Sequence, residues 1–249
     1  MASSAVFEPV DPAFFAAFVA ASADLAVELR LKVSSAGVEC RGFDPGMVAV
    51  VEWRIGAEYF KRLDAEGLVT VDVNGPDFTK ALRGLEKKDS LVVTVSDAQV
   101  AVGVTREGSR LRRCVARMEY SPPEKVPRLP PASINAVISA RGFAAAVKEV
   151  ADVNDRATIG TGGGALLFSC ENELRQAASY ALDPINPGEK VEGAGSGRFG
   201  VEYLKRIGGL SSTFALIKLS WNPDGPLEAV YEFPGAWARY VLAPVVQND

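Results

Sequence analysis

The two halves of the chain carry the same order of sequence patterns, and this repetition most limits how the chain can fold. Phe14 lies in the apolar helical segment "DPAFFAAFVAASAD", and Phe143 lies 129 positions later in the similar segment "RGFAAAVKEVADVND". Phe78 and Tyr203, in the second helical segment of each half, are 125 positions apart. A nearly constant offset between similar patterns predicts a duplicated structural unit, with a period longer than that of common solenoids.

Within each half, helical periodicity alternates with strand periodicity. Asp11 and Pro12 favour a helix start, and an apolar stripe follows at Phe14, Phe15, Phe18, Val19 and Leu25. Three strand-like runs come next, broken at Ser-Ala-Gly and Asp-Pro-Gly, in "LAVELRLKVSSAGVECRGFDPGMVAVVEWRI". A linking strand "LVTVDVN", a second helix and three more strands complete the half. This order predicts an α+β fold with antiparallel sheets.

A proline-rich stretch separates the halves. The segment "EYSPPEKVPRLPPASIN", residues 119–135, contains five prolines and favours an extended, semi-rigid backbone. We therefore predict an N-terminal domain at 1–118, a connector at 119–135 and a C-terminal domain at 136–249.

Composition excludes several classes of protein. With 48% hydrophobic and 23% charged residues, the 249-residue chain has the balance of a globular protein. The N-terminus has no basic start and no long apolar run, which favours a cytoplasmic protein. Histidine is absent, so the commonest general base and metal ligand are missing, and no cofactor or metal is predicted. Cys40, Cys114 and Cys170 are predicted to be buried structural thiols.

Two glycine clusters resemble phosphate-binding loops. The first, "GTGGGA" at 160–165, continues into a strand, which favours a hairpin turn. The second, "GSGRFG" at 195–200, matches G-x-G-x-x-G and opens a helix, but no βαβ pattern surrounds it. A flexible loop leading into that helix is the favoured interpretation, and a dinucleotide-binding enzyme remains the alternative.

Basic residues recur on the predicted helices of this chain, whose net charge is −4. Lys80, Arg83 and Lys87 have the spacing of one helical face, Arg141 and Lys148 are seven apart, and Lys205 and Arg206 lie on the fourth helix. A solvated face explains any one of them. Together they predict a cationic surface able to meet a phosphate backbone without reading sequence.

The C-terminal segment is apolar and ends its strand abruptly. Residues 240–242 favour a strand, but Pro244 has no N–H with which to extend the pairing. Val245 and Val246 therefore either fill a hole in this chain or help to build a surface for another.

With these features the chain resembles, nearly end to end, the proliferating cell nuclear antigen (PCNA) sliding clamps, especially the archaeal ones. The resemblance rests on "VSSAGVECRGFDPGMVAVVEWRI" (33–55), the connector (119–135), "EYLKRIGGLSSTFALIKLS" (202–220) and "YVLAP" (240–244). It implies a DNA clamp fold of two similar domains, each with two helices packed on antiparallel sheets, joined by an interdomain connector. It also implies a non-enzymatic processivity factor without a cofactor.

As a member of such a family, the chain would form a ring of three subunits whose helices surround duplex DNA without sequence specificity. The ring would be a homotrimer or a heterotrimer with sister clamp subunits, associated with the archaeal nucleoid. Its partners would be DNA polymerase, flap endonuclease, DNA ligase and the clamp loader, bound through short hydrophobic PIP-box motifs. The alternatives are a paralogue that acts only within a heterotrimer and one that acts in damage signalling.

The resemblance also implies particular site residues. An apolar pocket for partner peptides would be formed by Phe43, Met47, Val48, Val50, Val126, Leu129, Pro226, Leu242, Ala243, Pro244 and Val245. Subunits would pair the strand in "SRLRRCVAR" (109–117) with the strand in "LRQAASYAL" (174–182) of a neighbour, using Arg110, Arg112, Arg113, Leu174, Ala177 and Tyr180. The chain departs from the family in its first helix, residues 12–23, which carries no Lys or Arg where basic residues would face DNA.

Overall fold

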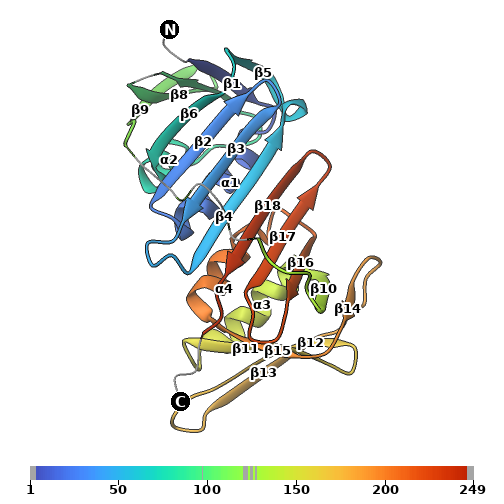
Figure 1. The fold of residues 1–249 in the computed structure, drawn as a ribbon. Helices are drawn as coiled ribbons and strands as arrows, with labels where there is room; N and C mark the ends of the chain where they lie inside the picture. Colours follow the sequence, from blue (N-terminus) through green and yellow to red (C-terminus); the bar gives the residue numbers. More distant parts are fainter. Residues whose placement is uncertain (1–3, 97, 120–122, 124–125, 127, 246–249) are drawn as a thin grey trace. The chain divides into compact units, whose positions relative to one another are not determined.

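The computed structural model describes residues 4–96, 98–119, 123, 126 and 128–245. The chain divides into two compact units (Figure 1). Unit 1 comprises Met1–Glu124 together with Phe233–Ala238, and unit 2 comprises Lys125–Glu232 together with Arg239–Asp249. Among the described helices, none is both long enough and apolar enough to cross a membrane.

Unit 1 contains two antiparallel sheets and two helices. One sheet has the strand order β5-β1-β7-β8-β9, and in the other β4, β3, β2 and β6 pair in that order. The elements are β1 (Ala5–Pro9), α1 (Pro12–Leu25), β2 (Glu28–Ser34), β3 (Gly37–Phe43), β4 (Ala49–Gly56), the 3-10 turn η1 (Ala57–Tyr59), β5 (Phe60–Ala65), β6 (Val69–Asn74), α2 (Gly75–Ala81), β7 (Ser90–Val95), β8 (Gln99–Arg106) and β9 (Ser109–Ala116).

Unit 2 repeats this plan. Its sheets have the orders β13-β12-β11-β15 and β14-β10-β16-β17-β18, again antiparallel. The elements are β10 (Ile134–Ser139), α3 (Ala140–Ala151), β11 (Arg156–Gly162), β12 (Ala165–Glu171), β13 (Ala177–Leu182), β14 (Lys190–Glu192), β15 (Ser196–Gly200), α4 (Val201–Ile207), η2 (Gly208–Leu210), β16 (Leu216–Trp221), β17 (Leu227–Phe233) and β18 (Ala236–Leu242), the last two contributing residues to unit 1 as well.

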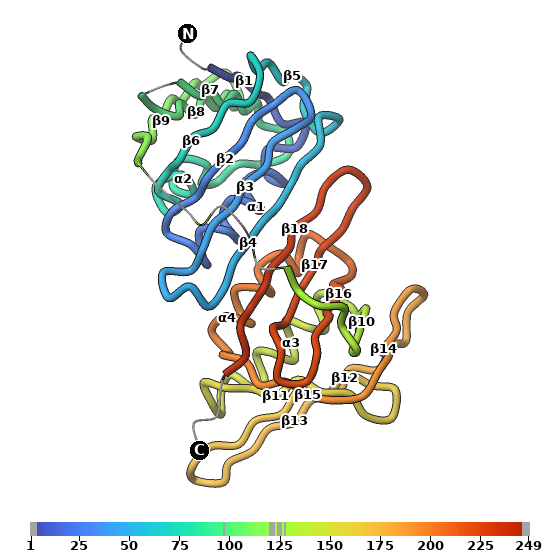
Figure 2. The backbone as a smooth tube through the Cα atoms, viewed as in Figure 1, coloured from blue at the N-terminus to red at the C-terminus, as the bar shows by residue number. Residues whose placement is uncertain are grey.

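The order of elements confirms the predicted duplication. Each unit runs through one strand, a helix, five strands, a second helix and three strands, as the colours of Figure 2 allow the reader to follow. The leading strands β1 and β10 are absent from the sequence prediction, because five or six residues carry too short a pattern. No local pattern indicates that Phe233–Ala238 groups with the first unit, since this depends on contacts with residues far earlier in the chain.

Aromatic side chains fill the core of unit 1. Phe15 of α1 makes edge-on contacts with Phe7, Trp53 and Phe78, with ring centroids 5.5–6.4 Å apart. The helix begins as predicted, with the side chain of Asp11 accepting a hydrogen bond from the main-chain N of Phe14 at 3.0 Å. Burial of apolar side chains, of which these rings are the largest, is the dominant favourable contribution to folding.

One polar group is enclosed in that core and is fully hydrogen-bonded. The Ser22 hydroxyl, completely buried on α1, donates to the carbonyl oxygen of Phe18 at 2.8 Å. The indole Nε1 of Trp53 in turn donates to the same hydroxyl at 2.7 Å. This pairing lets a tryptophan lie in the core without an unsatisfied N–H.

Unit 2 has the same kinds of interaction, a helix cap, an aromatic contact and a buried hydrogen bond, made by different residues. The Ser139 hydroxyl accepts from the main-chain N of Gly142 and so caps α3, whose Phe143 packs on Phe168 with ring centroids 5.9 Å apart. The hydroxyl of buried Tyr231 donates to the carbonyl oxygen of Ile207 at 2.9 Å. Burial raises the pKa of that phenol well above its usual value, which keeps it neutral and able to donate.

The glycines at 163 and 164 form the turn between β11 and β12. Both have positive φ angles, 62° and 84°, which residues with a Cβ rarely adopt. The prediction that "GTGGGA" forms a hairpin turn is therefore confirmed.

Candidate functional site

The third helix carries two of the predicted DNA-facing cations on its exposed surface. Arg141 lies in the first turn of α3 and Lys148 in the last, and both side chains are exposed. Neither forms an ion pair with another described residue. Their spacing of two helical turns places them on one side of the helix.

The second helix is shorter than predicted, so Arg83 and Lys87 do not lie on it. Helix α2 ends at Ala81, and Gly84 has a φ of 75° in the following turn. The guanidinium of Arg113 donates to the carbonyl oxygens of Lys80 and Ala81 at 3.2 and 2.8 Å, which caps the last turn. The prediction that Lys80, Arg83 and Lys87 share one helical face is therefore wrong, although all three are exposed.

On the fourth helix, the cations interact with their own neighbours. Lys205 donates to the carboxylate of Glu202 at 3.1 Å, one turn earlier. The guanidinium of Arg206 lies 5.3 Å from the centre of the Tyr203 ring. Both lie in the last turn of α4, where positive charge is favourable to the helix dipole.

The first helix presents alanines in place of cations. Its partly exposed positions include Ala13, Ala16, Ala17 and Ala20, and it has no Lys or Arg. Helix α1 therefore offers no positive charge to a polyanion.

The two strands predicted to join subunits are both sheet edges. Strand β9 is the last strand of the five-stranded sheet of unit 1, and β13 is the edge of the four-stranded sheet of unit 2. Arg110 and Arg112 of β9 are exposed, whereas Arg113 turns to α2 and does not stand at the edge as part of a charged seam. Ala177 and Tyr180 lie on β13, and Leu174 lies before it with 81% of its surface exposed.

The predicted pocket residues of unit 1 divide into exposed and buried members. Met47 is 59% exposed and has a φ of 59°, in the turn that the Asp44 carboxylate holds by accepting from Gly46 N at 2.9 Å. Val48 beside it is also exposed. Phe43 and Val50, at the ends of β3 and β4, are buried and would support such a surface without lining it.

The predicted pocket residues of unit 2 show the same division. Val126, Leu129, Pro226, Ala243, Pro244 and Val245 are partly exposed. Leu242 is 1% exposed and belongs to the core. After Pro244, the main-chain N of Val245 donates to the carbonyl oxygen of Arg198 at 2.8 Å, so the tail lies against β15. Val246 and part of the connector lie outside the described residues.

Two sequence interpretations need correction. Cys40 is buried, and burial raises the pKa of its thiol far above the usual value, but Cys114 is exposed on edge strand β9 and Cys170 is partly exposed. The prediction of three buried thiols is thus wrong for Cys114. It failed because alternation identifies a strand but not whether the strand lies at an edge.

The glycine-rich segment at 195–200 is also not a flexible loop. Residues Ser196–Gly200 form β15, which pairs with β11 along its whole length. A Cβ on Gly197 would lie 2.8 Å from the Phe199 ring, so the glycine is required by packing inside unit 2. This arrangement does not favour the dinucleotide-binding alternative, since such a loop follows a parallel strand of a βαβ unit.

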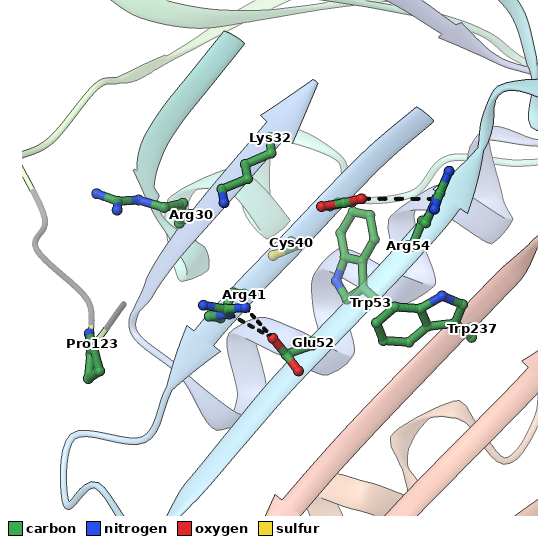
Figure 3. A pocket seen from close by; sticks show the side chains of 10 residues that line it. Arg30, Lys32, Cys40, Arg41, Glu52, Trp53, Arg54, Pro123 and Trp237 are labelled. Atoms are coloured by element: carbon green, nitrogen blue, oxygen red, sulfur yellow. Dashed lines mark hydrogen bonds and ion pairs between the residues drawn. The ribbon is translucent and has the colours of Figure 1, made fainter. Parts of the chain in front are cut away.

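A shallow hollow of about 380 Å³ lies on the exposed face of β2, β3 and β4 (Figure 3). Arg41 Nε donates to Glu52 Oε1 at 2.7 Å, Arg30 Nε donates to Asp72 Oδ1 at 2.8 Å, and Arg54 lies 4.0 Å from Glu39. Trp237 and Pro123 also line this hollow. The sequence prediction did not include it, although alternating charges along the three strands were the available signal. The paired charges make it a cross-strand ion-pair ladder.

Among the described residues, no cluster of acidic, cysteine or histidine side chains is arranged to hold a metal ion.

No family model matches the chain. It is 25% identical over 225 residues to DNA polymerase sliding clamp 3 of Sulfurisphaera tokodaii, covering 87% of this chain and 89% of that protein.

Solved structures give the fold. The PCNA of Entamoeba histolytica matches with a TM-score of 0.87 at 17% identity, covering 97% of this chain and 99% of that one. A chain of the PCNA2–PCNA3 complex from Sulfolobus tokodaii matches with a TM-score of 0.87 at 22% identity, covering 96% and 98%. In sequence the chain is similar to archaeal DNA polymerase sliding clamps, and its fold is that of the PCNA clamps. The prediction of a DNA clamp fold is therefore confirmed.

Proposed function

We propose that the chain is one subunit of a three-membered ring that encircles duplex DNA and tethers replication and repair enzymes to it. The observation that carries the proposal is the pair of dissimilar edge strands, β9 in one unit and β13 in the other. Pairing of unlike edges between chains is a head-to-tail contact, and such contacts generate rings when the rotation closes. Ring closure would also remove two edges that otherwise invite aggregation.

The proposed DNA contacts are made by cationic side chains on and beside the helices. They are Lys80, Arg83, Lys87, Arg141, Lys148, Lys205 and Arg206. Such contacts to phosphate are sequence-independent and salt-sensitive. A ring held by topology can keep them weak and so remain able to slide.

Partner enzymes are proposed to dock through short hydrophobic peptides. The exposed apolar positions in the unit 1 turn are Met47 and Val48, and those at the unit 2 terminus are Ala243, Pro244 and Val245. Apolar groups that remain exposed on a folded chain mark interaction surfaces. DNA polymerase, flap endonuclease, DNA ligase and the clamp loader are the proposed partners, since tethering raises their effective concentration at the template.

The test is retention on DNA of defined topology. Assembled clamp, made from this chain alone or with sister subunits, is loaded onto nicked circular DNA and the bound fraction is isolated at high salt. We expect the clamp to remain bound to circles and to leave within minutes of linearisation by a restriction enzyme. Equal loss from circular and linear DNA would contradict encirclement.

A further inference from the structure

We infer that the hollow on the exposed face of β2, β3 and β4 binds an extended acidic segment of a partner protein. This surface is a second docking site, separate from the apolar positions at Met47 and Val48. The inference goes beyond the proposed function and does not depend on it. It follows from one lysine, two arginines that face each other and a tryptophan at the far end of the hollow (Figure 3).

Lys32 is the cation of this hollow that lacks a partner. It lies on the exposed side of β2, opposite Glu39 of β3 and Thr70 of β6. The Glu39 carboxylate lies toward Arg54 instead, with Arg54 Nε 4.0 Å from Glu39 Oε1. Within the part of the chain that the structure describes, Lys32 forms no ion pair and no hydrogen bond through its side chain. Its ammonium group is therefore available to an added carboxylate.

Two arginines stand side by side next to this lysine. Arg30 of β2 and Arg41 of β3 are directly opposite each other in the register of the two strands, and Arg30 is two residues from Lys32 on the same face. Like charges placed directly opposite each other destabilise a sheet. Each guanidinium is held from its outer side, Arg30 by Asp72 and Arg41 by Glu52, with N–O distances of 2.8 and 2.6 Å. An anion seated between the arginines would offset their repulsion, so Arg30, Lys32 and Arg41 form a cationic corner that favours a bound carboxylate.

The acidic residues of the same face do not neutralise this cationic corner completely. Those nearest to it, Asp72, Glu39 and Glu52, each have a guanidinium as partner. Glu28 lies four residues before Lys32 on β2, about 13 Å away, and does not line the hollow. The cationic corner therefore keeps one positive charge that no carboxylate of the described residues offsets at ion-pair distance.

Trp237 marks the opposite end of the hollow. It is partly exposed and belongs to the segment of β18 that groups with unit 1, where Gly56 N donates to the carbonyl oxygen of Gly235. Three strand spacings separate β18 from β2, a distance of about 14 Å. An extended peptide covers this distance in about four residues. A small anion such as phosphate would fill the cationic corner without reaching the indole.

The arrangement of charges favours a peptide over a nucleic acid strand. Between the cationic corner and Trp237 lie the carboxylates of Glu39 and Glu52, which would repel a backbone that is charged at every phosphate. A peptide can place its carboxylates at the cationic corner, uncharged residues over the two glutamates and an apolar side chain on the indole. Tryptophan and arginine are enriched among the residues that dominate binding energy at interfaces. The occupant is therefore an extended segment with Asp or Glu at one end and an apolar residue about four positions away.

Fluorescence anisotropy with a labelled eight-residue peptide tests this site on the chain alone. The acidic peptide carries two adjacent aspartates and, four positions later, a leucine, and a second peptide has asparagines in place of the aspartates. We expect Lys32→Glu to weaken binding of the acidic peptide at least about five-fold, because an attraction is replaced by a repulsion. The wild-type affinity should fall as salt is raised from about 0.05 to about 0.5 M. The asparagine peptide should bind wild type and variant equally weakly.

Lys61→Glu, on β5 of the same unit, is the matched control. Lys61 is exposed and, like Lys32, has no ion pair with another described residue, so its reversal should leave binding of the acidic peptide unchanged. Trp237→Ala should weaken binding of the acidic peptide a few-fold. A peptide with glycine in place of the leucine should not distinguish this variant from wild type. Thermal melts show whether each variant keeps the wild-type fold.

Equal losses in Lys32→Glu and Lys61→Glu would overturn the inference, as would an asparagine peptide that binds as tightly as the acidic one or a wild-type chain that binds neither. A single-stranded oligonucleotide that displaces the acidic peptide at a lower concentration than unlabelled peptide does would assign the hollow to nucleic acid and also overturn it. Failure of the proposed function is a separate result. It is measured by retention on circular DNA and by binding of an uncharged peptide with aromatic anchors, neither of which depends on Lys32.

Discussion

Arg106 and Asp89 form a two-point ion pair beneath the turn that follows α2, where Arg106 Nε donates to Asp89 Oδ1 at 2.8 Å. The same carboxylate accepts from the main-chain N of Glu86 at 2.8 Å. The hydrogen bond from Arg106, followed by that from Glu86, lowers the pKa of Asp89 to about 2. This cluster holds residues 82–89 in a turn, which is why the helix does not continue through Arg83 and Lys87.

Replacing Asp89 with Asn should lower the Tm at pH 7 by a few degrees, because the variant loses the ionised acceptor. The pKa of Asp89 in the folded protein lies below its unfolded value, so its stabilising effect is complete above about pH 4 and is lost as the pH falls through about 2. The Tm difference between wild type and variant should therefore shrink between pH 4 and pH 2, followed by circular dichroism. Asp64→Asn, in the exposed pair with Arg62, is the control and should change little. A difference that is constant over this pH range would exclude the linkage.

The Ser22 and Trp53 pair should behave as a coupled unit. Ser22→Ala leaves the indole N–H of Trp53 without an acceptor in the core and should cost about 1–3 kcal/mol of unfolding free energy. Trp53→Phe removes the donor as well, so the double variant should lose about 1 kcal/mol less than the two single losses combined. Urea denaturation of all four proteins gives the coupling, and strict additivity would show that the hydrogen bond contributes nothing.

Arg113 and Arg110 are arginines on the same strand, β9, with different predicted roles. Arg113→Ala should lower the unfolding free energy by about 1–2 kcal/mol, since it uncaps the carbonyl oxygens of Lys80 and Ala81. Arg110→Ala should leave monomer stability within about 0.5 kcal/mol, because its side chain is exposed. Denaturation at a concentration where the chain is monomeric measures both, and equal losses would contradict the assignment.

The sequence predicted the repeated plan and the α+β class because periodicity and turn residues act locally. Asp11 and Pro12 fix one helix start, and Gly163 with Gly164 fixes one hairpin. It could not predict where α2 ends, because residues far along the chain decide this. Arg113 of β9 binds the last carbonyl oxygens of the helix, and Arg106 at the end of β8 pairs with Asp89 in the turn.

For the candidate sites, the sequence identified residue types but not their exposure. Leu242 and Val50 have the same apolar pattern as Val245 and Val48, yet the first two are core residues. Cys114 looked buried because strand alternation does not reveal which strand is an edge. Whether an apolar residue is buried and whether a strand is an edge both depend on strands that pair with it from far along the chain.

The proposed DNA face can be tested directly at Arg141 and Lys148. Arg141→Glu/Lys148→Glu should weaken DNA binding by the assembled clamp and reduce the slope of log K against log salt by about 2 if each residue contacts one phosphate. Lys61→Glu, at an exposed position of β5, is the control for a single charge reversal outside the helices. Fluorescence anisotropy over a salt series measures both slopes, and an unchanged slope in the α3 variant would remove these residues from the DNA face.

Substitution of Met47 can separate an effect on peptide binding from an effect on folding stability. Its φ of 59° is strained for any residue with a Cβ, so Met47→Gly should change the unfolding free energy by less than about 1 kcal/mol. The variant lacks the exposed thioether side chain and should bind a partner peptide with aromatic anchors several-fold more weakly. Calorimetric titration with such a peptide checks this, and unaltered affinity would place the docking surface elsewhere.

The segment Phe233–Ala238 bears on how the chain is made. It belongs to unit 1, where the carbonyl oxygen of Gly235 accepts from Gly56 N at 2.8 Å and the Tyr59 hydroxyl donates to the carbonyl oxygen of Pro234. The ribosome must therefore release nearly the whole polypeptide before its earliest-synthesised half can acquire its last backbone partner. A nascent chain arrested before residue 233 should leave that half incomplete and more accessible to chaperones.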